Sequence, residues 1–224
     1  MKRLRYLKVE FNGTLSTAEI PAFRGAIADK AGLENHLFHN HDPDQGRVIY
    51  QYPLIQYKTI RKKPAILCID QGVDEIHHFF GNENWELPIN GKKLDLTIDK
   101  LSLNQFTMQV WDKYFHYDIL NWIALNQENY KKYQELEVLS EKIEFLEKKL
   151  TGNILAFAKG IDWTVDKTID LKITELDDSR PVRVKDQKLM GFSARFRCNV
   201  FLPDFIGLGK NVSLGFGTIK RQQQ

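Results

Sequence analysis

Apolar and polar positions alternate at the start of the chain. Leu7, Val9 and Phe11 share one face of an extended segment whose other face carries Lys8 and Glu10, which predicts a half-buried strand. The elements predicted before residue 100 are a strand over 2–11, a helix over 17–32, strands over 48–58 and 63–70, a helix over 72–80 and a turn-rich hairpin within 87–99. This β-α-β-β-α-β order is that of a ferredoxin-like unit.

A similar order recurs in the second half. The predicted elements there are a strand over 101–111, a long and broken helical stretch over 118–150, and strands over 168–176, 181–185, 191–201 and 216–220. We therefore expect an α+β protein of two tandem ferredoxin-like (RRM-like) domains, residues 1–100 and 101–224, with antiparallel sheets and a C-terminal glycine-rich loop. The heptad-like stripe from Leu136 to Leu150 favours a helix that packs on its own domain, with a homodimer seam as the alternative.

Composition narrows the class of protein. The chain has 224 residues, 42% of them hydrophobic, enough for a packed core, and no apolar run reaches the length of a membrane span. The charged N-terminus lacks an apolar signal core, so a cytoplasmic protein without a membrane partner is expected. Cys68 and Cys198 stand far apart, which excludes a disulfide scaffold and a cysteine-based zinc finger.

Three of the six histidines fall in one short stretch after the first predicted helix. His36, His39 and His41 are followed by Asp42. Imidazoles titrate near neutral pH, so two of them held in a loop can take one proton and give another. A metal site is the alternative, because the four side chains supply nitrogen and oxygen ligands, but their spacing matches no usual zinc pattern. The non-functional alternative is that these histidines cap a helix or face solvent. Three histidines in one short stretch make that alternative less convincing.

A second candidate is the glycine-rich segment over 207–217. Gly207, Gly209, Gly215 and Gly217 form two Gly-x-Gly pairs around Lys210. Glycines allow positive φ and close approach of the backbone to a ligand, and exposed amides beside a lysine suit phosphate oxygens. The spacing fits neither a Walker loop nor a dinucleotide fingerprint. The non-functional alternative is a glycine-rich turn that only connects two edge elements.

Charge is concentrated near the C-terminus. Residues 180–221 hold nine Lys and Arg against two Asp and Glu, whereas the whole chain has a net charge of only +3. Alternation places Arg183 and Lys185 on the outer face of one predicted strand, and Arg195 and Arg197 on the outer face of another. If the two strands form a hairpin, four cations share a sheet face, which favours a phosphodiester ligand over a solvated surface.

These motifs together resemble a known family. The chain is similar to the CRISPR repeat-processing endoribonucleases of the repeat-associated "mysterious protein" superfamily, whose glycine loop reads Gly-hydrophobic-Gly, five residues, Gly-hydrophobic-Gly. Residues 207–217 fit that pattern position for position. The stretches 20–28, 36–41 and 52–58 look like the N-terminal region of a bacterial and archaeal subgroup. The resemblance covers both halves and is weak over 80–165.

The resemblance implies cleavage of precursor CRISPR RNA without a metal or other cofactor. A ribose 2′-hydroxyl would attack the adjacent phosphate, leaving a 2′,3′-cyclic phosphate and a 5′-hydroxyl. His39 and His41 would act as base and acid in an order the sequence leaves open, with Lys58 and Tyr52 in support of charge and position. The residues expected to hold the RNA are Arg183, Lys185, Arg195, Arg197, Gly207, Gly209, Lys210, Gly215 and Gly217.

The resemblance implies CRISPR repeat RNA as the binding partner. Formation of a homodimer, or association with a CRISPR effector complex, is compatible with that partner. Two rival functions stay open. One is a non-catalytic repeat-RNA-binding subunit that uses only the basic face and the glycine loop. The other is a metal-dependent hydrolase that uses His36, His39, His41 and Asp42. The charge pattern favours a polyanion over a small substrate, so this hydrolase ranks last.

Overall fold

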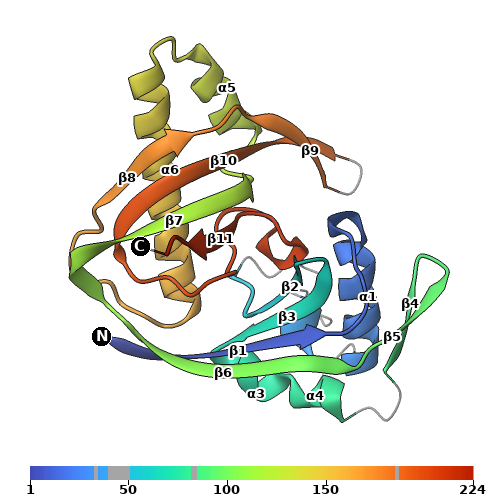
Figure 1. Ribbon diagram of the computed structural model, residues 1–224. Coiled ribbons are helices and arrows are strands. Elements are labelled where there is room, and N and C mark those ends of the chain that lie inside the picture. The colour runs from blue at the N-terminus through green and yellow to red at the C-terminus, as the bar shows by residue number, and fades with distance from the viewer. Residues whose placement is uncertain (33–34, 40–50, 82–84, 185–186, 224) are drawn as a thin grey trace. The chain divides into compact units, whose positions relative to one another are not determined.

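The computed structural model describes residues 1–32, 35–39, 51–81, 85–184 and 187–223. It is an α+β protein that divides into two compact units (Figure 1). The N-terminal unit is Arg3–Thr107 with Ser213–Gly215, and the C-terminal unit is Met1–Lys2, Met108–Val212 and Phe216–Gln224. The sequence pattern places the division near residue 100, and the contacts place it between Thr107 and Met108.

A four-stranded sheet in the order β2-β3-β1-β6 forms the N-terminal unit. Its strands are β1 (Lys2–Phe11), β2 (Ile55–Ile60), β3 (Lys63–Ile69) and β6 (Ile98–Met108). Antiparallel pairing joins β1 to β3 and β3 to β2. If the four strands are numbered along the chain, their order is 2-3-1-4, that of a ferredoxin-like sheet.

The fourth strand comes from a segment that the sequence pattern places in the second domain. Residues 101–108 were predicted to open the second domain, but they lie in β6 and close the first sheet. The segment expected to be the fourth strand instead forms a separate hairpin of β4 (Glu86–Ile89) and β5 (Lys92–Asp95). Its Asn90-Gly91 turn pairs two short strands locally, which is why both belong to a sheet of their own.

Helices cover one face of this sheet. They are α1 (Ile20–Ala31), α2 (His36–His39), α3 (Gln71–Glu75) and α4 (His77–Phe80). Phe11 from the central strand packs edge-on against Phe23 of α1 and Phe79 of α4. The predicted alternation of β1 is confirmed, because Leu7, Val9 and Phe11 are all buried in this core.

A second antiparallel sheet, in the order β11-β7-β10-β8, forms the C-terminal unit. Its strands are β7 (Val110–Trp122), β8 (Leu171–Leu176), β10 (Gln187–Val200) and β11 (Thr218–Arg221), and β9 (Arg180–Val184) pairs with the start of β10. In chain order the path reads 4-1-3-2, so the ferredoxin-like arrangement is repeated. The second helix of that pattern is replaced by the glycine-rich connection over 201–217.

The predicted helix over 118–150 is wrong at its start. Residues up to Trp122 belong to β7, where Tyr117 and Ile119 are fully buried between two partner strands. The helical stretch begins only at α5 (Gln127–Glu135), breaks as expected, and resumes as α6 (Leu139–Gly160). An apolar run that faces both a core and neighbouring strands has no clear period, which is why its type was misread.

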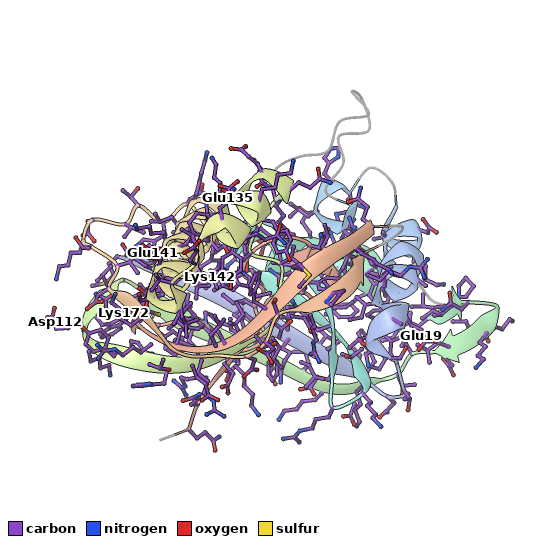
Figure 2. The ribbon with its side chains drawn as sticks, turned by 90° about the horizontal axis from the view of Figure 1, so that it is seen from above. Glu19, Asp112, Glu135, Glu141, Lys142 and Lys172 are labelled. Carbon is purple, nitrogen blue, oxygen red and sulfur yellow. The ribbon has the colours of Figure 1, made fainter. Side chains whose placement is uncertain are left out.

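The α6 helix packs on its own unit, as the leucine stripe predicts. Leu146 and Leu150 are buried, whereas Leu139 at its first turn is 64% exposed. Buried Glu147 accepts a hydrogen bond from the Ile173 amide of β8 at 2.9 Å, and its other oxygen pairs with Lys172 at 2.9 Å. Figure 2 shows Lys172 beside this helix. Within the described part of the chain, no helix is long and apolar enough to cross a membrane.

Candidate functional site

The glycine-rich loop is held by close packing inside the C-terminal unit. Gly209 has φ +96°, and a Cβ there would lie 2.7 Å from the Trp122 indole. Gly217 has φ +60°, and a Cβ there would overlap the carbonyl oxygen of Leu208. A Cβ on Gly207 would lie 2.5 Å from Cβ of Val212. These three glycines are therefore required by the fold of the loop itself.

The amides of this loop are less available than the sequence indicated. The Leu208 N–H donates to the Gly217 carbonyl at 2.9 Å, and the Lys210 N–H donates to Ile123 at 3.1 Å. The Gly217 N–H donates to Asn121 at 3.2 Å. The expectation of exposed amides for a phosphate is wrong for these three groups, because backbone N–H groups near buried carbonyls pair within the protein.

One part of the loop belongs to the other unit. Ser213–Gly215 is grouped with residues of the N-terminal unit. Gly215 has φ +87°, and a Cβ there would lie 2.7 Å from Cδ1 of Ile20 at the start of α1 and 3.8 Å from the Tyr57 carbonyl oxygen of β2. The second Gly-x-Gly pair therefore starts against the helix that precedes the histidine-rich stretch.

Tyr57 links β2 to the element that carries His39. Its hydroxyl donates to the Phe38 carbonyl at 3.4 Å, and its ring packs edge-on against Phe23. Burial raises the pKa of the Tyr57 phenol, with the nearby Arg24 guanidinium acting in the opposite direction. His39 is the last residue of α2. The side chain of His39 and the whole of His41 lie outside the described part of the chain.

Arg24 is a candidate site residue that is absent from the set predicted by the sequence pattern. It lies four residues after Ile20 and three before Ile27, inside the apolar stripe of α1. Burial lowers the pKa of its guanidinium, and the interaction with Tyr57 raises it. An arginine at a core-facing helical position was the available signal, because a buried cation needs a compensating role.

Lys58 is the most unusual of the predicted residues. It is only 2% exposed, and burial lowers the pKa of its ammonium group to about 7. It follows Tyr57 on β2 and so points to the opposite sheet face, pairing in register with Ala65. The structure thus places Lys58 and α2 on opposite faces of a strand that forms the edge of the sheet.

Tyr52 lies just before β2 and is half-buried. Burial raises the pKa of its phenol, and a hydrogen bond with the Gln56 side chain acts in the opposite direction. Gln56 is itself fully buried, and its amide donates to the Pro53 carbonyl at 3.1 Å. Tyr52 is therefore a neutral, anchored hydroxyl, suited to positioning a ligand rather than to exchanging protons.

The basic strands form a hairpin, but not the predicted cationic face. β9 pairs with the start of β10, so Arg183 lies opposite Lys188. Arg195 lies farther along, between β7 and β8, and pairs with Asp118 at 3.3 Å and Glu175 at 2.5 Å. Arg195 is therefore not a free cation, because Asp118 and Glu175 from neighbouring strands balance its charge. Lys185 lies outside the described residues.

Two other cations are placed differently. The Arg197 guanidinium stacks 4.5 Å from the centre of the Tyr114 ring. Lys210 is exposed at the rim of a hollow of about 500 Å³. The other lining residues of that hollow are Leu125, Asn126, Gln127, Glu128, Gln187, Leu189 and Asn211. Among the described residues no three His, Cys, Asp or Glu side chains gather as metal ligands.

Two ferredoxin-like units, the second with a glycine-rich connection in place of its second helix, define the class of this protein. Family models for the Cas6b N-terminal domain and the Cas6b C-terminal domain match residues 2–107 and 109–222. The chain belongs to the Cas6b family.

Individual relatives agree. The solved "Crystal structure of Cas6b" has a TM-score of 0.89 and 30% identity, with 99% of this chain and 100% of that chain covered. "Crystal structure of CRISPR RNA processing endoribonuclease Cas6b" has a TM-score of 0.74 and 26% identity over the same shares. An uncharacterized protein of Methanocaldococcus jannaschii is 41% identical over 103 residues, 46% of this chain and 69% of that protein.

Proposed function

We propose that this protein cleaves precursor CRISPR RNA within its repeats, by a metal-independent attack of a ribose 2′-hydroxyl. One observation carries the proposal. Gly215 of the glycine loop packs on Ile20 and near Tyr57. The Tyr57 hydroxyl donates a hydrogen bond to the carbonyl of Phe38, the residue before His39. Ser213–Gly215 of the loop and the histidine-bearing helix are thus parts of the same compact unit, where one RNA strand can meet both.

The reaction needs one base and one acid. One imidazole of the pair His39 and His41 takes the proton from the 2′-hydroxyl, whose oxygen then forms a bond to the adjacent phosphorus. The bond from phosphorus to the 5′-oxygen breaks, and the other imidazole protonates that oxygen. The products are a 2′,3′-cyclic phosphate and a 5′-hydroxyl, and no oxidant or water is consumed.

Lys58 supports the charge that develops on phosphorus. Lys58 is 2% exposed, so it acts on the phosphate through the field of its ammonium group rather than by direct contact. A cation held in a site of low polarity interacts more strongly with an anion than one in water. With a pKa of about 7, Lys58 is partly protonated at neutral pH, and an approaching phosphate raises that fraction. Tyr52 positions the strand through its hydroxyl.

The C-terminal unit binds the RNA backbone without regard to base sequence. Arg183, Lys185, Arg197 and Lys210 contact phosphates, and Arg195 contributes less because Asp118 and Glu175 already pair with it. The glycines 207, 209, 215 and 217 shape the loop. Homodimer formation and association with a CRISPR effector complex remain compatible with this role, and sedimentation with and without repeat RNA measures the first.

The decisive experiment incubates the protein with repeat RNAs in EDTA and identifies the product ends. We expect cyclic phosphate and 5′-hydroxyl ends, and loss of at least about a hundredfold in rate for His39→Ala or His41→Ala. His36→Ala at the exposed start of α2 is the matched control. Tight binding without cleavage would instead support the RNA-binding subunit, and wild-type rates in the double histidine variant would refute the site.

A further inference from the structure

The turn between β2 and β3 is strained and carries two cations. Ile60 pairs with Lys63, so Arg61 and Lys62 alone make the connection. Their φ angles are 52° and 65°, both left-handed. Two left-handed residues in a two-residue hairpin define a type I′ turn, a form that long side chains adopt at a cost.

The same unit contains an unstrained counterpart. The turn between β4 and β5 is also two residues long, Asn90 and Gly91, with φ angles of 48° and 78°. Asn-Gly is the preferred sequence for this geometry, because both residues tolerate positive φ. The chain thus uses the favourable pair at one hairpin and an unfavourable, doubly charged pair at the other. Strain that is retained in a native protein concentrates at functional positions.

The two cations are available for a ligand. Both side chains are exposed, and neither forms an ion pair among the residues that the structure describes. The adjacent Lys63, in contrast, pairs with Asp99 at 2.8 Å. The Lys62 carbonyl accepts a hydrogen bond from the Leu15 amide at 2.8 Å, so the turn is fixed to the segment that leads into α1.

The turn also lies on the unit that carries the candidate site. Arg61 directly follows β2, three residues after Lys58 in the chain. Leu15 leads through a short turn to Ile20, against which Gly215 packs. A fixed pair of charges at the end of an edge strand suits an extended polyanion.

We propose that the Arg61–Lys62 turn is a contact for the phosphate backbone of the RNA strand that the protein processes. This inference rests on the proposed function and adds a binding element to it. The strained residues persist because their charges bind phosphate, whereas Asn-Gly would give a more stable hairpin without that contact.

The test replaces the turn by its counterpart, Arg61→Asn with Lys62→Gly. We expect the melting temperature to rise by about 2–4 °C or more, because the strain is relieved. We also expect the dissociation constant for repeat RNA to rise by about tenfold. The slope of log affinity against log salt should become shallower by about 0.7 for each lost phosphate contact.

Two further variants make the result decisive. Arg61→Gln with Lys62→Gln keeps the positive-φ strain and should lose the same affinity without the gain in melting temperature. Lys92→Gln with Lys93→Gln removes the same charge from the other hairpin and should bind nearly as the wild type does. Wild-type affinity of the Asn-Gly variant, or an equal loss in the Lys92 and Lys93 variant, would overturn the inference. Because binding is measured, failure of cleavage in the wild type would refute the proposed function separately.

Discussion

The two units share a strand order but differ in how the third strand reaches the fourth. In the N-terminal unit, helices α3 and α4 and a hairpin connect β3 to β6. In the C-terminal unit, the connection from β10 to β11 is the glycine-rich segment over 201–217, whose one short helix is the 3-10 turn Val212–Leu214. The same sheet thus tolerates either a packed crossover or a loop that packs through its glycines.

The two connections differ in how they pack. A helical crossover buries apolar side chains on its own sheet, and Phe79 of α4 is fully buried there. The glycine loop replaces that packing by backbone-to-backbone approach, and it can therefore send Ser213–Gly215 to the other unit. The repeated ferredoxin-like sheet is the scaffold. The glycine loop, which replaces a helix of that fold, places Ser213–Gly215 among residues of the N-terminal half of the chain.

The largest expected effect is at Gly217. Its Cβ would overlap the Leu208 carbonyl oxygen, and its φ of +60° disfavours any side chain. Gly217→Ala should lower the free energy of unfolding by about 3 kcal/mol or more, measured by urea titration. Gly152→Ala in α6 is the control, because open space surrounds that position and alanine favours a helix by about 0.5–1 kcal/mol. Equal effects at the two glycines would contradict the packing account.

The second effect is the pH dependence contributed by Lys58. Its pKa is lowered from 10.5 to about 7 by burial, so between these values the unfolded chain binds more protons than the folded one. Stability should therefore rise with pH in this window, by up to about 1.4 kcal/mol per pH unit. The gain is absent below about pH 7, where the buried lysine is charged.

Lys58→Met isolates this contribution. The variant removes the buried ammonium and keeps an apolar chain of similar length, so the difference in unfolding free energy from wild type should change steadily between pH 7 and 9. Urea titrations of both proteins at each pH measure it. A constant difference across that range would mean that Lys58 titrates normally. Cleavage by the variant should fall, because the phosphorane loses a cation.

The sequence predicted local elements better than their assembly. The alternation in β1 and the Asn90-Gly91 turn depend on neighbouring residues, and the structure confirms both. The assignment of residues 101–108 to the wrong sheet came from a choice between equivalent neighbours, which sequence periodicity cannot distinguish. The strand predicted over 48–58 overlaps β2 only over 55–58, and the edge position of β2 depends on long-range pairing.

The candidate site divides in the same way. Residue types and the glycine spacing identified the loop, because positions that need a positive φ favour glycine, and glycine is visible in the sequence. The partners of Arg195 were not predictable, since Asp118 and Glu175 come from strands distant in the chain. The location of Ser213–Gly215 in the N-terminal unit is likewise a tertiary fact that no local pattern contains.

Gly215 offers a smaller and more specific perturbation than Gly217. The one close contact of a Cβ there would be with Cδ1 of Ile20 at 2.7 Å, the flexible end of a side chain, although φ is +87°. Gly215→Ala should lower the free energy of unfolding by about 1–2 kcal/mol, mostly through backbone strain. Adding Ile20→Val, which removes Cδ1, should restore part of that loss. No recovery in the double variant would place the loop away from α1.

The smallest expected effect is a difference in RNA affinity between two variants. One removes a cation that already forms ion pairs within the protein, and the other removes an exposed cation that we propose to bind RNA. Lys210 is exposed at the rim of a hollow, whereas Arg195 is held between Asp118 and Glu175. Lys210→Gln should weaken RNA binding about three- to tenfold and make the salt slope shallower by about 0.7. Arg195→Gln should weaken it about twofold or less, because Arg195 already pairs with Asp118 and Glu175 and contributes little to phosphate binding. Filter binding at several salt concentrations measures both variants, and a larger loss at Arg195 would show that RNA displaces its acidic partners.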